Sequence, residues 1–100
     1  MNKKTFYRVG AICDADGEEV RLFGYGQYVG EEVPPPEVKM FGIPMTMKNP
    51  KIVLDDGKVV WGCECWWGDE AKVKHSIGTR RVKMVDIEKT RAESQTSHEP

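Results

Sequence analysis

The chain has 100 residues, of which 15 are basic and 16 acidic, so its formal charge is −1. One hydrophobic core is expected at this length, and the balanced charge excludes a general attraction to nucleic acid or to an acidic membrane. No apolar run approaches the roughly 20 residues that span a bilayer, and no apolar signal segment follows Met1. We therefore expect a soluble, cytoplasmic, single-domain protein with no membrane partner, and one poorly suited to nucleic acid.

The sequence contains three cysteines, Cys13, Cys63 and Cys65. An odd number without a signal sequence is typical of a reducing compartment. Only Cys63 and Cys65 are close together, but two residues usually separate the paired cysteines of a zinc knuckle, whereas one separates these. We expect the thiols to pack as small apolar groups, and we predict no metal and no cofactor.

The first third of the chain predicts a β-hairpin. Residues 5–12 and 20–29 are rich in strand-forming residues, and the Asp- and Gly-containing segment 14–18 between them favours a turn. Strict alternation would place Val20, Leu22, Gly24, Gly26 and Tyr28 on one face of the second strand, and Arg21, Phe23, Tyr25, Gln27 and Val29 on the other. The two glycines predict a bend, a bulge or the close approach of another backbone or a ligand.

Residues 30–50 predict a long loop, because several prolines oppose regular structure there. The segment from Pro34 to Met47 is also apolar, and a loop of this length in a small domain is commonly functional. Two interpretations are open: a lid packed over the core, or a contact surface for a partner, to which methionine side chains adapt. We expect the loop to be ordered against the sheet, since it would otherwise expose a large apolar surface.

A second hairpin is predicted where Asp56-Gly57, a type I′ turn sequence, joins residues 51–55 to residues 58–66. Trp61 should be buried. Alternation over this strand places Trp61, Cys63, Cys65 and Trp67 on one face, and Glu64 and Trp66 on the other. Glu64 would then lie beside Trp66 and could supply a hydrogen bond to a ligand stacked on the indole ring.

The remaining residues predict a short helix, one strand and a tail. Asp69 is a suitable N-cap for a helix ending at Gly78, residues 80–87 return to strand alternation, and residues 89–100 should fray beyond a helical turn. The predicted fold is α+β, mainly an antiparallel sheet or small barrel of about five strands with one short helix. Residues 1–88 would form the domain and 89–100 a polar tail.

Exposed aromatic rings and arginines provide the candidate binding site. Guanidinium groups bind phosphates while neighbouring rings stack on a base. The candidate ligand-binding residues are Trp66, Tyr25, Arg8, Arg21, Arg80 and Arg81. Two alternatives stay open: Trp66 is covered by the helix or the loop, and the arginines form an ordinary sheet surface with carboxylate partners on neighbouring strands.

The sequence contains none of the common catalytic motifs, such as a phosphate-binding P-loop, a nucleophile elbow or a zinc-protease helix. Paired acids such as Glu18-Glu19 fall in predicted turns, where solvated charge is the ordinary explanation. We therefore predict a binding protein with no catalytic residues.

The run NPKIVLDDGKVVWGCECWWG at residues 49–68, with FYRVG at residues 6–10, resembles small proteins carried by bacteriophages and prophages. Such proteins often act against host defence, and the Thoeris anti-defence sponges are similar in being small, β-rich and oligomeric. The resemblance implies a homo-oligomer in the host cytoplasm that sequesters a small anionic, nucleotide-like ligand such as a cyclic ADP-ribose-type signal. The alternative is a protein–protein inhibitor or interaction module that docks on a host protein through the apolar loop 34–47.

Overall fold

A computed structural model describes the backbone of residues 7–96 and the side chains of residues 7–93. What the sequence predicts for residues 5, 6 and 97–100 lies outside this range. One sheet contains six strands: β1 (Tyr7–Ala15), β2 (Glu19–Glu32), β5 (Asn49–Leu54), β6 (Val59–Trp61), β7 (Trp66–Asp69) and β8 (Arg81–Met84). The other elements are a two-stranded sheet of β3 (Lys39–Met40) and β4 (Ile43–Pro44), the 3₁₀ turn η1 (Gly62–Glu64), and the helices α1 (Glu70–Ile77) and α2 (Ile87–Thr96).

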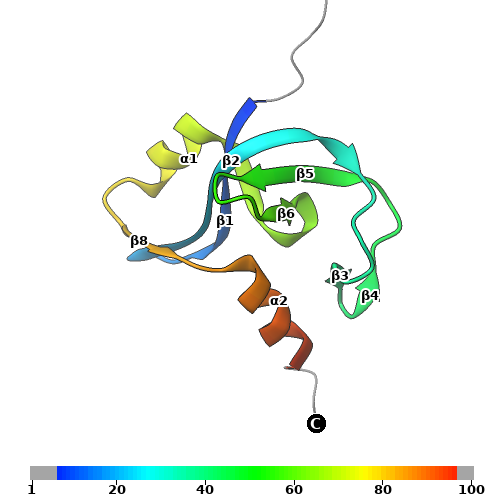
Figure 1. The fold of residues 1–100 in the computed structure, drawn as a ribbon. Helices are drawn as coiled ribbons and strands as arrows, with labels where there is room; N and C mark the ends of the chain where they lie inside the picture. Colours follow the sequence, from blue (N-terminus) through cyan, green and yellow to red (C-terminus); the bar gives the residue numbers. More distant parts are fainter. Residues whose placement is uncertain (1–6, 97–100) are drawn as a thin grey trace, which may run out of the picture.

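The large sheet has the order β6-β5-β2-β1-β7, with β8 beside the first part of β2 (Figure 1). All of its pairings are antiparallel except that of β8 with β2, which is parallel. The predicted α+β class with a mainly antiparallel sheet is confirmed, whereas the sheet is not closed into a barrel. The described residues form eight strands and two helices rather than about five strands and one helix.

The predicted first hairpin is present, but its second strand contains a bulge. The pairing runs from Tyr7 opposite Tyr28 to Ala15 opposite Val20, with a register shift next to Phe23. Phe23 therefore joins the core cluster that contains Val9, while Tyr25 packs on the other cluster. The face assignment based on strict alternation is wrong beyond this bulge, because an extra residue in one strand reverses the direction of those that follow.

Both faces of the sheet are covered. The larger cluster of buried side chains includes Ile87, the first residue of α2. Its other members are Val9, Ala11, Phe23, Ile52, Leu54 and Val60. The smaller cluster lies under α1 and comprises Val20, Leu22, Val73 and Ile77. The two helices thus pack on opposite faces. Within the described residues, no helix is long and apolar enough to cross a membrane.

The second hairpin forms, but with a different turn and a shorter strand. Gly57 has a φ of 92° and donates its N–H to the Leu54 carbonyl oxygen at 2.8 Å. The loop is therefore three residues long, and it is not the predicted type I′ turn, because Asp56 does not have a positive φ. Trp61 is buried, as predicted. After Trp61 the chain turns through η1 and pairs as β7 with β1, so the predicted alternation through residues 62–65 is wrong.

The helix predicted after Asp69 is confirmed. The Asp69 carboxylate accepts the N–H groups of Ala71 and Lys72, and the helix ends at Gly78, whose φ is 61°. The prediction that the chain frays after a helical turn is wrong, since it forms α2. Ile87 anchors the start of α2 in the core, and Arg91 holds its middle to Glu64 of η1.

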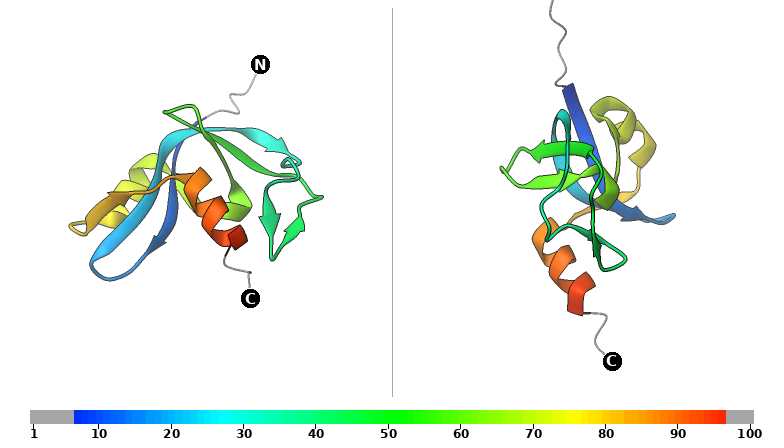
Figure 2. Two further views of the ribbon diagram at one scale, coloured as in Figure 1. Left: turned by 60° about the horizontal axis from the view of Figure 1, so that its bottom comes forward. Right: turned by 90° about the vertical axis from the view of Figure 1, so that its right-hand side faces the viewer.

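The predicted long loop is shorter than expected and carries its own hairpin, β3–β4. Pro34 and Val38 are buried against the domain, as a lid would be. The prediction that this segment is ordered against the sheet is wrong for the β3–β4 hairpin, which stands apart from the large sheet (Figure 2). Its apolar side chains are exposed. In both views of Figure 2 this hairpin and α2 extend from the same side of the domain.

Candidate functional site

Trp66 is an exposed aromatic residue on the edge strand β7. Its side chain is 79% exposed and lies opposite Ile12 of β1, on the face that α1 covers. The adjacent Trp67 points to the main core and stacks on Tyr28, with ring centroids 5.4 Å apart. The sequence correctly separated Trp66 from Trp61 and Trp67. Alternation within β7 separates Trp66 from Trp67, whereas η1 lies between Trp61 and Trp66.

Tyr25 lies on the same face of the sheet but is half-buried. Its ring packs beside the smaller core cluster, and the ammonium group of Lys74 lies 4.9 Å from the ring centroid. Gly10, its cross-strand partner, leaves room for the ring, since a Cβ there would approach Tyr25 to 2.9 Å. The arrangement already supplies Tyr25 with a cation. Whether Tyr25 or Trp66 contacts a ligand stays a prediction.

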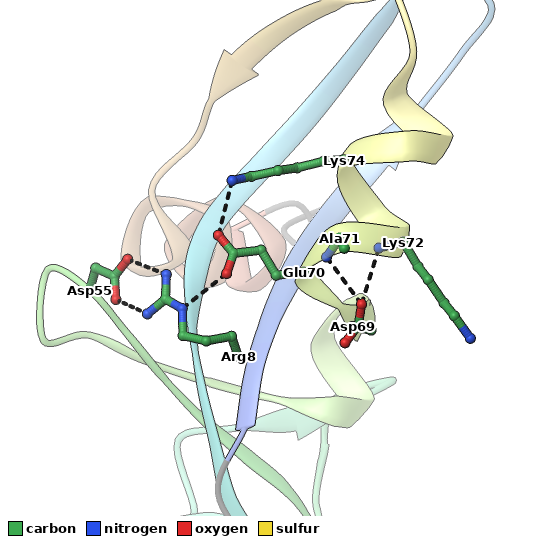
Figure 3. A network of polar contacts seen from close by, with 7 residues as sticks. All are labelled: Arg8, Asp55, Asp69, Glu70, Ala71, Lys72 and Lys74. Atoms are coloured by element: carbon green, nitrogen blue, oxygen red, sulfur yellow. Dashed lines mark hydrogen bonds and ion pairs between the residues drawn. The ribbon is translucent and has the colours of Figure 1, made fainter.

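The guanidinium of Arg8 is held by two carboxylates (Figure 3). Its two terminal nitrogens donate to Asp55 at 2.6 and 2.9 Å, and its Nε donates to Glu70 at 3.1 Å. Glu70 also pairs with Lys74 at 3.1 Å. The hydrogen bonds to Asp55, and to a smaller extent to Glu70, raise the pKa of Arg8. The same hydrogen bonds lower the pKa of Asp55 and of Glu70.

The ion pairs of Arg8 should therefore make the stability of the protein fall at acidic pH. Both carboxylates have folded-state pKa values below their unfolded values of about 4. Their contribution to stability is therefore complete above that value and is lost as the pH falls through the folded pKa values. We expect the urea midpoint of the Arg8→Gln variant to fall less than that of the wild type on acidification from about pH 6 to about pH 3. Arg81→Gln is the control, and identical pH profiles for Arg8→Gln and wild type would contradict the role of this network.

The other candidate arginines lie on different elements. Arg21 pairs with three carboxylates, those of Asp14, Asp16 and Glu19. Arg80 donates to the carbonyl oxygens of Ser76 at 2.7 Å, Asp16 at 2.9 Å and Ile77 at 3.1 Å, and so ties the end of α1 to the β1–β2 turn. Among the four candidate arginines, and within the described part of the chain, only the exposed Arg81 has a guanidinium group without a hydrogen-bond or ion-pair partner.

The structure does not bring the six candidate residues to one point. Arg8 and Tyr25 are linked through Glu70 and Lys74. Arg21 and Arg80 both contact Asp16 at the β1–β2 turn. Arg8 lies near the other end of β1, about 20 Å away at the rise of a strand. Three of the four arginines, Arg8, Arg21 and Arg80, also already pair with groups of the protein itself. The prediction that at least one arginine binds a ligand phosphate beside Trp66 and Tyr25 stays a prediction.

A second surface surrounds the β3–β4 turn. The sequence predicted an apolar contact segment at residues 34–47 but did not indicate which of its side chains would be exposed. The hairpin surface, as we call it, consists of Met40, Phe41, Ile43 and Met47, whose exposed fractions are 37, 93, 66 and 71%. Phe41 has a φ of 54°, and Gly42, next to it, has a φ of 79°. Positive φ at both central residues is the type I′ pattern, in which a bulky residue such as phenylalanine is rare and strained. The ring is thus held outward at the tip.

A cleft of about 590 Å³ lies beside the hairpin surface. One wall comes from residues 37 and 39–42, and the other from η1 and α2, including Cys63, Ile87 and Thr90. A second cleft, of about 560 Å³, is lined by Trp61 and residues of β5 and β6 and shares Glu37 and Arg91 with the first. Both volumes are within the range that accommodates a small molecule or a few side chains.

Glu64 and Arg91 form an ion pair that lines the first cleft, and Arg91 also lines the second. The Glu64 carboxylate accepts Nε of Arg91 at 2.6 Å, Nη2 of Arg91 at 2.7 Å and the backbone N–H of Trp61 at 3.0 Å. Arg91 also donates to the Val59 carbonyl oxygen at 3.0 Å. Glu64 therefore does not lie beside Trp66 as predicted, because Arg91 draws it inward. This pair could not be predicted from the sequence, since the partners are 27 residues apart.

The three cysteines lie on β1 (Cys13), in η1 (Cys63) and directly after η1 (Cys65). Cys13 and Cys65 contact the main core, and burial raises the pKa of Cys65 to about 12. Burial also raises the pKa of Cys13 and Cys63, so all three are protonated at neutral pH. Among the described residues, no group of three or more histidine, cysteine, aspartate or glutamate side chains is arranged to hold a metal ion.

No protein-family model matches the chain, and comparison with curated proteins and with solved structures finds no similar protein. The surfaces described above are therefore the basis for assigning a function to the protein.

Proposed function

We propose that this protein is a non-enzymatic binding protein that acts on another protein through the hairpin surface. The supporting observation is Phe41, an aromatic side chain that is 93% exposed at a backbone conformation its residue type disfavours. A left-handed φ costs an ordinary residue about 1–2 kcal/mol, and strained residues concentrate where a ligand or partner is held. Exposed aromatic anchors of this kind supply much of the free energy of protein association.

The chemistry of the hairpin surface defines the partner surface that would fit it. Residues 38–48 carry two lysines, Lys39 and Lys48, and no acidic residue. A complementary surface has an apolar pocket that receives Phe41 and carboxylates around its rim. The methionines on either side adapt to such a pocket because their side chains are unbranched and flexible.

A second candidate function is the sequestration of a small nucleotide-like ligand of the cyclic ADP-ribose type by stacking on Trp66. The observation that favours it is the exposure of Trp66, at 79%. Against it stands the pairing of Arg8, Arg21 and Arg80 with groups of the protein itself, which leaves few donors for a phosphate. We therefore rank the protein-binding function first.

Native mass spectrometry of the protein isolated from its own cells distinguishes the two functions. A retained protein should be lost by at least about tenfold in Phe41→Ser, because hot-spot aromatics contribute more than 1.4 kcal/mol, and should persist in Trp66→Ala. If the second candidate is correct, a retained small ligand should instead bind Trp66→Ala more weakly by about 1–3 kcal/mol, the range for one stacked base. A bound protein whose retention is the same in Phe41→Ser and wild type would contradict the first proposal.

A further inference from the structure

We infer that the hairpin surface pairs with the same surface of a second copy of this chain, each Phe41 entering the cleft of the other copy. The inference rests on the proposed function, because it names a partner for the same surface. Three observations support it: the position of the cleft next to Phe41, the charges that line the cleft, and the apolar area of the hairpin surface.

The cleft and the exposed ring are neighbours on one surface. Phe41 borders the cleft of about 590 Å³, yet its own ring is 93% exposed and does not fill it. When a protruding group and a receiving cleft lie side by side, a two-fold axis between them seats both groups at once. The contact is then closed, and neither copy keeps an apolar tip in water.

The charges lining the cleft are compatible with this pairing. Arg91 and Glu64 neutralise one another in one wall, and the other wall carries Glu37 and Lys39. The cleft therefore presents no excess of either sign that would repel an apolar ring or a second copy.

The area available corresponds to a weak dimer. Given their exposed fractions, the four side chains of the hairpin surface present on the order of 400 Å² of apolar surface, since a buried aromatic alone contributes about 150–250 Å². Two copies would then remove on the order of 1,000 Å² from water, including part of the cleft walls, which is near the lower limit for a specific interface. A patch of this size is comparable to the largest apolar patch on a typical monomer, which is often functional.

Sedimentation equilibrium from micromolar to millimolar concentration tests the pairing. We expect a monomer–dimer equilibrium whose dissociation constant rises by about 30-fold or more in Phe41→Ala, as for a hot-spot residue. Trp66→Ala, which removes an equally exposed ring outside this surface, should leave the constant unchanged. A monomer at every concentration, a dimer insensitive to Phe41→Ala, or growth beyond the dimer would each overturn the inference.

Cys63 in the cleft wall provides a direct test of where residue 41 lies. A Phe41→Cys/Cys63→Ser variant is mixed with wild type and oxidised mildly; Phe41 of the wild type can still enter the variant's cleft, so half of the interface remains. We expect an intermolecular disulfide between position 41 and Cys63 of the wild type. Thr46→Cys/Cys63→Ser should give little product, as should Phe41→Cys/Cys63→Ser mixed with Cys63→Ser. Equal yields in all three mixtures would overturn the inference.

The two proposals fail in distinguishable ways. If the protein is a monomer but loses its native partner in Phe41→Ser, the pairing of copies is wrong and the protein-binding function stands. If Phe41→Ala changes neither the dimer nor the binding of any native protein, both are wrong.

Discussion

Replacing Gly26 with alanine is expected to force β2 and β5 apart and to remove a large part of the protein's stability. A Cβ at this position would lie 2.1 Å from the Val53 carbonyl oxygen and 2.6 Å from the Leu54 Cα. Both atoms belong to the backbone of the paired strand, so no side-chain rotation relieves the overlap. Overpacking of side chains typically costs 1–3 kcal/mol, and here we expect a loss on the order of 4 kcal/mol or more, a large part of the stability of an ordinary domain.

Urea unfolding followed by tryptophan fluorescence measures this loss, since Trp61 is buried and should become exposed. Gly17→Ala is the matched control, because a Cβ there meets no atom within 4 Å and its φ is not positive. The control should remain within about 0.5 kcal/mol of wild type. A Gly26→Ala variant that is destabilised by less than 1 kcal/mol would show that β5 can shift away at little cost.

The case of Gly26 also shows what the sequence could predict. Two glycines in one strand indicated a bulge or a close approach, and the structure contains both, a register shift beside Gly24 and the contact at Gly26. The faces of the residues after the bulge could not be predicted, because counting by alternation assumes that no residue is inserted. Tyr25 therefore lies on the face opposite to that of Phe23, where alternation had placed them together.

Local signals located the hairpins and α1, since Asp-Gly and an Asp N-cap act on the residues next to them. Residues 62–65 could not be predicted in the same way. Their turn depends on Arg91, which lies 27 residues further on and holds Glu64 inward, and on Pro50, which lies 2.7 Å from the position a Gly62 Cβ would take. Long-range contacts of this kind have no signature in a short window of sequence.

The candidate site was predicted in part for the same reason. The face of Trp66, opposite to that of Trp61 and Trp67, followed from counting along the strand, whereas its exposure was left open. The partners of the arginines did not follow, because Asp55 and Glu70 are 47 and 62 residues from Arg8. The exposed tip at Phe41-Gly42 had one local signal, a glycine between apolar residues, but the prolines on either side favoured a loop.

Removing the Glu64 carboxylate is expected to detach α2 from the domain. In Glu64→Ala, the Arg91 guanidinium, whose side chain is only 23% exposed, loses both of its bonds to the carboxylate, and the Trp61 N–H loses its acceptor. Hydrogen bonds to charged groups contribute about 1.5–3 kcal/mol each when a partner is left unsatisfied, but Arg91 regains some water as α2 loosens. We expect a net destabilisation of about 2–3 kcal/mol. Loss of this ion pair should also change the shape of the cleft beside Phe41, since both residues line it.

Amide hydrogen exchange together with urea unfolding tests this expectation. Protection should fall most in residues 87–96 and least in the centre of β1 and β2, because Arg91 ties α2 to Glu64 and to the Val59 carbonyl oxygen. Glu32→Ala is the control, since its exposed carboxylate pairs with Lys51 at 3.4 Å and should contribute less than about 1 kcal/mol. The Arg91→Ala variant should lose about as much stability as Glu64→Ala, and the double variant little more than either, because the two side chains act as one unit. If Glu64→Ala costs no more than Glu32→Ala, then the ion pair between Glu64 and Arg91 does not hold α2 to the domain.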